Sequence, residues 1–170
     1  MDRRLRTSQG EIWVRESAER AAMSEAGRGE TIAIASDHAG FHLKEVLGGE
    51  LLKLGYGVLD LGPENDESVD YPDFAHMLAK SLSEGQATRG VLVCGSGIGM
   101  SIAANRHPGI RAALCQNAEA ARLARQHNDA NVLALGERMI GEEAAKECLR
   151  VFLSTEFEGG RHARRVAKLG

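Results

Sequence analysis

The stretch "VLVCGSGIGMSIAAN", residues 91–105, joins a strand-forming run to a helix-compatible run through three glycines in five positions. An apolar strand that ends in such a turn before a helix brings backbone N–H groups against an anion. Neither an anion loop nor a core strand requires the thiol of Cys94, which ends the strand. The stretch therefore predicts an anion site, and it leaves open whether Cys94 packs or reacts.

Short apolar runs and longer helical patterns alternate from Thr31 onward, which is typical of βα units that feed a parallel sheet. Runs rich in Val, Ile, Leu and Ala predict buried strands over 31–36, 57–61, 90–94, 110–115 and 131–136. Apolar residues at helical spacing predict helices over 43–54, 72–82, 117–127 and 141–153. We expect an α/β fold, a three-layer Rossmann-like sandwich with a five-stranded parallel sheet, over residues 31–170.

Composition excludes several classes of protein. The chain has 170 residues, 43% of them hydrophobic, which suits one domain. A net charge of −3 gives no electrostatic footprint for nucleic acid, and no apolar run approaches the roughly 20 residues of a membrane span. Three cysteines without a C-x-x-C pair predict neither a disulfide framework nor a zinc site, and they favour a cytoplasmic location.

Residues 1–30 differ from the rest, with six arginines, six acidic residues and no apolar core of the kind that a signal peptide carries. We expect this extension to be disordered or weakly helical. Met23 is an alternative start of the chain.

In an open parallel sheet the ligand crevice lies at the carboxyl ends of the strands. Asp37 and His38 follow the first predicted strand, Cys94 ends the third, and Arg138 follows the fifth. Asp37 suits a helix N-cap equally well. His38 and His42 have the i, i+4 spacing of metal ligands, but no adjacent Glu and no third ligand accompanies them, so we expect no metal.

A free cysteine is most often a small buried hydrophobe, and this is our interpretation of Cys115 and Cys148. Cys94 differs because the turn after it faces a helix N-terminus, where positive potential increases the thiolate fraction. The glycine loop lacks the last glycine of a dinucleotide fingerprint, the lysine of a Walker loop and the first glycine of a hydrolase elbow. What remains is a nest of N–H donors for a phosphate or a developing oxyanion.

His127 and Asn128 lie near the end of the third predicted helix. Crossover helices run antiparallel to their strands, so His127 should lie at the opposite sheet edge from Cys94 of the same chain. If His127 is catalytic rather than a helix C-terminal cation, a dimer in which it completes the neighbour's site resolves the separation. The basic tail at 161–168 is by itself typical of a solvated face.

Several motifs together resemble ribose-5-phosphate isomerase B, of the sugar-phosphate isomerase group that includes galactose-6-phosphate isomerase. They are "ASDHAGFHLK", "DYPDFA", "VCGSGIGMSIAANR", "GIRAALC", "ARQHNDANVLALGERMIG" and "EGGRHARRV", in order from about Thr31 to Val166. The resemblance implies a cofactor-free aldose–ketose isomerase of the pentose phosphate pathway. It also implies a homodimer with active sites between subunits, with pairing of dimers into tetramers left open.

The resemblance also implies residue roles. Cys94 would be the base, with Ser96 near the reacting hydroxyls, Asp37 assisting proton movement at the oxygens, and His127 opening the sugar ring. The oxyanion donors would be Asn128 and the N–H groups of Gly95, Gly97, Ile98 and Gly99. His38, Arg138, Arg161 and Arg165 would bind the phosphate, and Tyr71 would line the sugar pocket.

Two alternatives stay open at this point. The substrate could be galactose 6-phosphate, allose 6-phosphate or a tetrulose 4-phosphate, since each methylene-sized difference is worth only about 1–3 kcal/mol of discrimination. The chain could also be a non-catalytic phosphate-binding domain. The joint presence of Cys94, Asp37 and His127 argues against that, because binding alone needs only the loop and the arginines.

Overall fold

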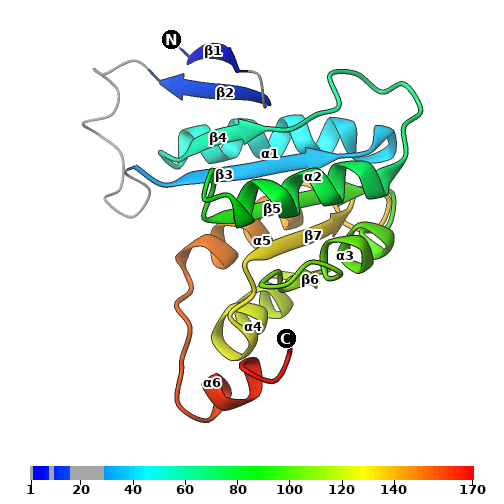
Figure 1. The fold of residues 1–170 in the computed structure, drawn as a ribbon. Coiled ribbons are helices and arrows are strands. Elements are labelled where there is room, and N and C mark those ends of the chain that lie inside the picture. Colours follow the sequence, from blue (N-terminus) through cyan, green and yellow to red (C-terminus); the bar gives the residue numbers. More distant parts are fainter. Residues whose placement is uncertain (1, 8–9, 16–28) are drawn as a thin grey trace.

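One mixed sheet organises the chain (Figure 1). The computed structural model describes residues 2–7, 10–15 and 29–170. Within these residues the strand order is β1-β2-β4-β3-β5-β7-β6. The strands are β1 (Asp2–Thr7), β2 (Gly10–Arg15), β3 (Thr31–Ser36), β4 (Gly57–Asp60), β5 (Arg89–Cys94), β6 (Ala112–Leu114) and β7 (Val132–Gly136). The five strands from β3 to β7 run parallel, which confirms the predicted five-stranded parallel sheet.

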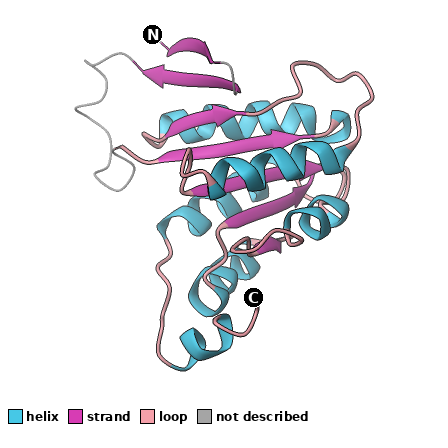
Figure 2. Ribbon diagram, in the orientation of Figure 1, coloured by secondary structure: helices cyan, strands magenta, loops and turns pink. Residues whose placement is uncertain are grey.

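Helices cover both faces of this sheet and make three layers (Figure 2). They are α1 (Phe41–Lys53), α2 (Tyr71–Ser83), α3 (Ile98–Ala104), α4 (Ala118–Asn128), α5 (Glu142–Ser154) and α6 (Arg161–Val166), with a 3-10 turn, η3 (His38–Gly40), before α1. The apolar sides of α1, α4 and α5 pack on one face, and those of α2 and α3 pack on the other.

Side-chain alternation along the strands divides the core in two. On β3, Ile32 and Ile34 point into the cluster under α1, whereas Ala33 and Ala35 point into the cluster under α2. All four are at most 1% exposed. A strand buried on both faces reads as a continuous apolar run, and this is why the sequence predicted these strands without a period-two pattern.

The N-terminal segment corrects an expectation. Residues 2–7 and 10–15, which we expected to be disordered or weakly helical, form a hairpin whose second strand pairs antiparallel with β4. β4 would otherwise be the sheet edge on that side, and its free backbone groups accept a strand from distant sequence. The rest of the extension, 16–28 with Met23, lies outside the described residues.

The start of the predicted domain is tied to the sheet by an ion pair. Arg89 Nη2 lies 2.7 Å from Glu30 Oε2, and Thr88 Oγ1 donates to Glu30 Oε1 at 2.5 Å. Burial alone would raise the pKa of Glu30, but the hydrogen bonds from Arg89 and Thr88 hold that pKa below its ordinary value. Glu30 therefore packs with the sheet, and the boundary at residue 31 stays a prediction.

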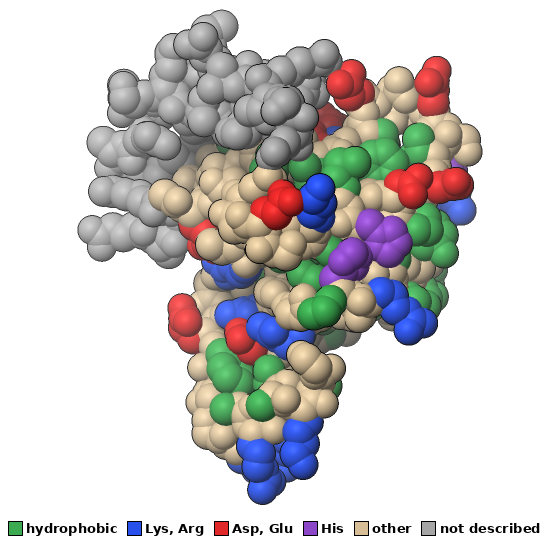
Figure 3. All heavy atoms as spheres, viewed as in Figure 1, with side chains coloured by type: hydrophobic (Ala, Val, Ile, Leu, Met, Phe, Trp, Pro, Cys, Tyr) green, Lys and Arg blue, Asp and Glu red, His purple; other side chains and the backbone are tan. Residues whose placement is uncertain are grey.

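Apolar side chains remain exposed on the face covered by α2 and α3. Ile98 and Ile102, one helical turn apart on α3, are 52% and 54% exposed, and Met77 on α2 is 43% exposed. Figure 3 shows hydrophobic, histidine and basic side chains together on this face.

A buried ion pair joins α1 to β4. The Lys44 ammonium, 1% exposed, lies 2.9 and 2.8 Å from the two carboxylate oxygens of Asp60. Asp60 Oδ1 also accepts the N–H of Gly62 at 2.9 Å. Removing one partner of a buried pair leaves the other charge uncompensated, which costs far more than losing an exposed pair.

We predict that Lys44→Met, which keeps most of the side-chain volume, lowers the free energy of unfolding by about 3–5 kcal/mol in urea denaturation. The matched control is Lys53→Met, on the same helix but 68% exposed, which should cost about 0–1 kcal/mol. Equal effects of the two substitutions would contradict the assignment of Lys44 as a buried structural charge.

Candidate active site

Three loops meet at the carboxyl edge of the parallel sheet. In the strand register Ser36 pairs with Val93, and Cys94 pairs with Gly136. The Asp37 N–H donates to the Val93 carbonyl at 3.2 Å, and the Glu137 N–H donates to the Cys94 carbonyl at 2.9 Å. The structure thus places Asp37, Cys94 and the loop of Arg138 along one edge, as their positions after parallel strands predicted.

Two glycines let the three loops approach one another closely. A Cβ on Gly40 would lie 2.5 Å from the Val93 carbonyl, and a Cβ on Gly136 would lie 2.5 Å from the Ser96 carbonyl. Both distances are too short for a side chain, and the contacting atoms are backbone, which cannot rotate away. The glycine loop after β5 is therefore held between the loops after β3 and β7.

The Cys94 sulfur accepts a hydrogen bond at the start of α3. The Gly97 N–H donates to Cys94 Sγ at 3.0 Å, and Gly97 itself has φ of 77°, a conformation that favours glycine. The Ile98 N–H donates to Ser96 Oγ at 3.3 Å. Cys94 is 5% exposed and also contacts the core under α2 and α3. Its sulfur is therefore buried, with a polar hydrogen-bond donor directed at it.

The other two thiols are chemically different. Burial raises the pKa of Cys115 to about 12, with a further contribution from Cys148. Burial likewise raises the pKa of Cys148 to about 11, with a contribution from Glu147. Both side chains lie in the core between the sheet and α4 and α5. They are protonated near neutral pH, consistent with their interpretation as packing residues.

Asp37 and His38 are both engaged by backbone donors. Asp37 Oδ1 accepts the Gly40 N–H at 3.0 Å and caps η3, so the N-cap alternative describes one of its contacts. The Val69 N–H donates to His38 Nδ1 at 3.3 Å. The neutral His38 ring then carries its proton on Nε2, which is a donor suited to an anion.

Arg138 and Tyr71 lie beside the glycine loop. A Cβ on Gly95 would lie 3.4 Å from Arg138 Nη1, and a Cβ on Gly99 would lie 2.6 Å from the Tyr71 ring. Arg138 is exposed, and Tyr71 is 40% exposed. The guanidinium and the phenol therefore border the N–H donors at the start of α3.

The remaining predicted site residues lie elsewhere. α4 ends at Asn128, four residues before β7 begins at Val132, so His127 and Asn128 lie at the amino edge of the sheet. Arg161 and Arg165 belong to α6, which lies beside α4 (Figure 1). The structure does not bring these four residues to Cys94 within one chain, and this matches the expected direction of a crossover helix.

His127 belongs to a cluster that the sequence reasoning missed. Its ring stacks on His162 with a centroid distance of 4.3 Å and an interplanar angle of 8°. Glu158 Oε2 lies 4.0 Å from His127 Nε2 and 3.6 Å from His162 Nε2. The i, i+4 spacing of Glu158 and His162 was a usable signal. Nitrogen lone pairs lie in their ring planes, so those of parallel stacked rings do not converge on a metal ion.

Glu137 was missed as well. Its Oε2 accepts the Leu43 N–H at 2.9 Å in the first turn of α1, where a carboxylate is favoured. Glu137 thereby ties the loop that carries Arg138 to α1. No local pattern indicates this contact, because the two residues are 94 positions apart.

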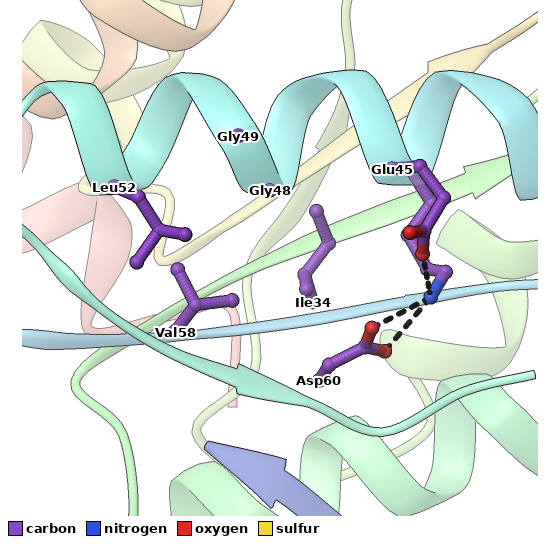
Figure 4. A pocket seen from close by; sticks show the side chains of 8 residues that line it. Ile34, Glu45, Gly48, Gly49, Leu52, Val58 and Asp60 are labelled. Atoms are coloured by element: carbon purple, nitrogen blue, oxygen red, sulfur yellow. Dashed lines mark hydrogen bonds and ion pairs between the residues drawn. The ribbon is translucent and has the colours of Figure 1, made fainter. Parts of the chain in front are cut away.

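A pocket of about 200 Å³ lies away from these groups, between α1 and the β3–β4 side of the sheet (Figure 4). Its lining includes Ile34, Leu52 and Val58, and Glu45 and Asp60 face the Lys44 ammonium at one end. It shares no residue with the predicted site, and its charged groups already pair with one another.

The fold has three layers, and its five parallel strands end at one edge of the sheet. A carboxylate, a thiol, N–H donors and a guanidinium lie along this edge, which defines an α/β enzyme that acts on a small anionic molecule. The chain belongs to the Ribose/Galactose Isomerase family, whose model matches residues 32–169.

The sequences of known proteins align with this chain along most of their own length. Ribose-5-phosphate isomerase B of Escherichia coli K12 is 45% identical over 135 residues, which cover 79% of this chain and 91% of that protein. D-erythrulose-4-phosphate isomerase of Pectobacterium atrosepticum is also 45% identical, over 141 residues that cover 82% of this chain and 93% of that protein. The crystal structure of a ribose 5-phosphate isomerase from Thermotoga maritima matches this structure with a TM-score of 0.82. Its sequence is 54% identical, and the match covers 84% of this chain and 98% of that chain.

The chain is accordingly an aldose–ketose isomerase of the sugar-phosphate class. In the described part of the chain, no helix has the length and apolar character required to cross a membrane.

Proposed function

We propose that the protein interconverts ribose 5-phosphate and ribulose 5-phosphate through an enediolate, as a cytoplasmic enzyme of pentose phosphate metabolism. The observation that carries the mechanism is the hydrogen bond from the Gly97 N–H to Cys94 Sγ, on the edge shared with Asp37. The names of relatives from Escherichia coli and Thermotoga maritima support ribose 5-phosphate as the substrate.

Cys94 acts as the base in this proposal. The thiolate takes the proton from C2 of the open-chain aldose and returns it to C1, while the carbonyl moves from C1 to C2. Asp37 carries the proton from the C2 hydroxyl oxygen to the C1 oxygen. No electron leaves the sugar, so the cycle needs no cofactor.

The glycine loop supplies donors for the enediolate oxygens. The N–H groups of Gly95 and Gly99 serve this role, and the Ile98 N–H, which also donates to Ser96 Oγ, joins them, while that of Gly97 holds the sulfur. Ser96 lies next to these groups, and Tyr71 borders the sugar. His38 Nε2 and the Arg138 guanidinium bind the phosphate from the same chain.

The site is completed by a second copy of the chain. His127 and Asn128 at the amino edge, with Arg161 and Arg165 on α6, reach the neighbour's Cys94 in a homodimer. The exposed Ile98 and Ile102, on the helix that follows the glycine loop, supply an apolar surface next to the site. Arg161 and Arg165 are exposed and are suited to a phosphate dianion.

A substrate series tests the proposed function. We expect kcat/KM for ribose 5-phosphate to exceed those for galactose 6-phosphate, allose 6-phosphate and erythrose 4-phosphate by about tenfold or more. The relative named for erythrulose 4-phosphate makes the four-carbon sugar the most informative competitor. A higher kcat/KM for any competitor would reassign the substrate, and no turnover of any of them would refute the proposal.

The cysteine base makes a separate prediction. Cys94→Ala should lower kcat by about 10²- to 10⁴-fold, because the proton acceptor is lost. Affinity for ribose 5-phosphate, measured by calorimetry, should hardly change, because the phosphate contacts lie on other residues. Cys148→Ala is the matched control and should retain turnover. Substantial turnover by Cys94→Ala would remove Cys94 from the role of base.

Mixed dimers test the shared site. We co-express Cys94→Ala and His127→Ala chains with different tags and purify the heterodimer. One of its two sites then combines an intact Cys94 with the partner's intact His127, so the purified heterodimer should recover about half of the parent activity. Each homodimeric variant should stay inactive. No recovery in the mixed dimer would show that the two residues do not meet across an interface.

A further inference from the structure

The cluster of His127, Glu158 and His162 lies where the C-terminal arm, residues 155–166, meets the end of α4. The Glu158 N–H donates to the Gln126 carbonyl at 3.1 Å, and Arg125 Nε donates to the Thr155 carbonyl at 3.2 Å. These contacts attach the arm to the last turn of α4. The backbone of Glu158 is therefore fixed against the last turn of α4, which places its carboxylate within reach of the His127 ring.

The two stacked imidazoles are not equivalent. His162, with a side chain 8% exposed, accepts a hydrogen bond from Arg161 Nε at its Nε2 atom at 3.5 Å, so its proton is on Nδ1. Burial lowers the pKa of His162, and the neighbouring His127 and Arg161 lower it further. His162 is therefore an uncharged ring that packs flat against His127.

Glu158 is consequently the acceptor available to His127. The cations near the cluster are Arg161 and Arg165 on α6 and Arg122 on α4, and Arg122 is itself paired with Glu119. Stacking on His162 fixes the plane of the His127 ring, and the carboxylate oxygen lies on its Nε2 side at 4.0 Å. The Glu158 side chain is 49% exposed and free to shorten this distance when the site is occupied.

We propose that Glu158 is the positioning residue of His127, holding one proton on Nε2 so that Nδ1 is the nitrogen that exchanges a proton with the sugar ring. The inference rests on the proposed function, in which His127 opens the furanose. A carboxylate that fixes the tautomer of a catalytic imidazole is a recurring device of acid–base catalysis.

The ring-opening step balances with these groups. The anomeric hydroxyl on C1 gives its proton to Asp37, the C1–O4 bond breaks, and O4 takes the proton from His127 Nδ1. Nε2 keeps its proton toward Glu158 throughout. The step starts from His127 protonated on both nitrogens and leaves Asp37 protonated and His127 as the neutral Nε2–H tautomer. Because ribulose 5-phosphate leaves as an open chain, passage of one proton from Asp37 to His127 through solvent restores both groups.

The test compares a sugar that forms a ring with one that does not. Ribose 5-phosphate is largely furanose, whereas erythrose 4-phosphate cannot close a furanose because its O4 is esterified. Glu158→Gln should lower kcat/KM for ribose 5-phosphate by about 10- to 100-fold and leave that for erythrose 4-phosphate nearly unchanged. Glu158→Asp should restore part of the loss. Glu156→Gln, an exposed acid on the same arm, is the matched control and should behave as the parent.

A second readout does not depend on turnover. In the ¹⁵N-labelled parent, nitrogen shifts of His127 should report the Nε2–H tautomer, and Glu158→Gln should give a mixture of tautomers while Glu156→Gln does not. An equal loss with both sugars, no loss with either, or an Nδ1–H tautomer in the parent would overturn the proposal. If the parent isomerises neither sugar, the proposed function fails instead, and the tautomer measurement still decides the role of Glu158.

Discussion

The close approach of three backbone loops at the carboxyl edge is the constraint on which the predicted site depends. The loop after β5 has no room for side chains at its contacts with Gly40 and Gly136. Its position is set by hydrogen bonds from Asp37 and Glu137 to the Val93 and Cys94 carbonyls. Each such bond is worth only about 0.5–1.5 kcal/mol net, but together they fix where the Cys94 sulfur lies relative to the Asp37 carboxylate without relying on flexible side chains.

Much of the fold was predictable because its information is local. Buried parallel strands are continuous apolar runs, and the helices between them have apolar residues at helical spacing. The hairpin of residues 2–7 and 10–15 was not predictable in this way, because residues of β2 pair with residues of β4 that are 45 to 49 positions away. α6 was missed because its six residues, rich in arginine, carry no apolar period.

The site was predictable in outline for a geometric reason. Parallel strands end at one edge, so polar residues directly after strands are brought together whatever the details of packing. Contacts between segments distant in sequence were beyond this reasoning. Nothing near Glu137 in the sequence indicates that it binds the Leu43 N–H, and nothing near His127 indicates that His162 packs against its ring.

The distance between the two edges of the sheet separates the C-terminal arm from the Cys94 loop of the same chain. β7 is five residues long, about 13 Å from end to end, so groups at its amino edge cannot reach a ligand at the carboxyl edge of the same chain. The arm is bound to α4 through the Gln126 and Thr155 carbonyls, so Arg161 on the arm and His127 on α4 keep a fixed relative position. Any phosphate that Arg161 binds is held at a fixed place relative to the His127 ring. Binding energy from the phosphate is then available to orient the sugar, which is how a remote group contributes to the rate of a reaction at C1 and C2.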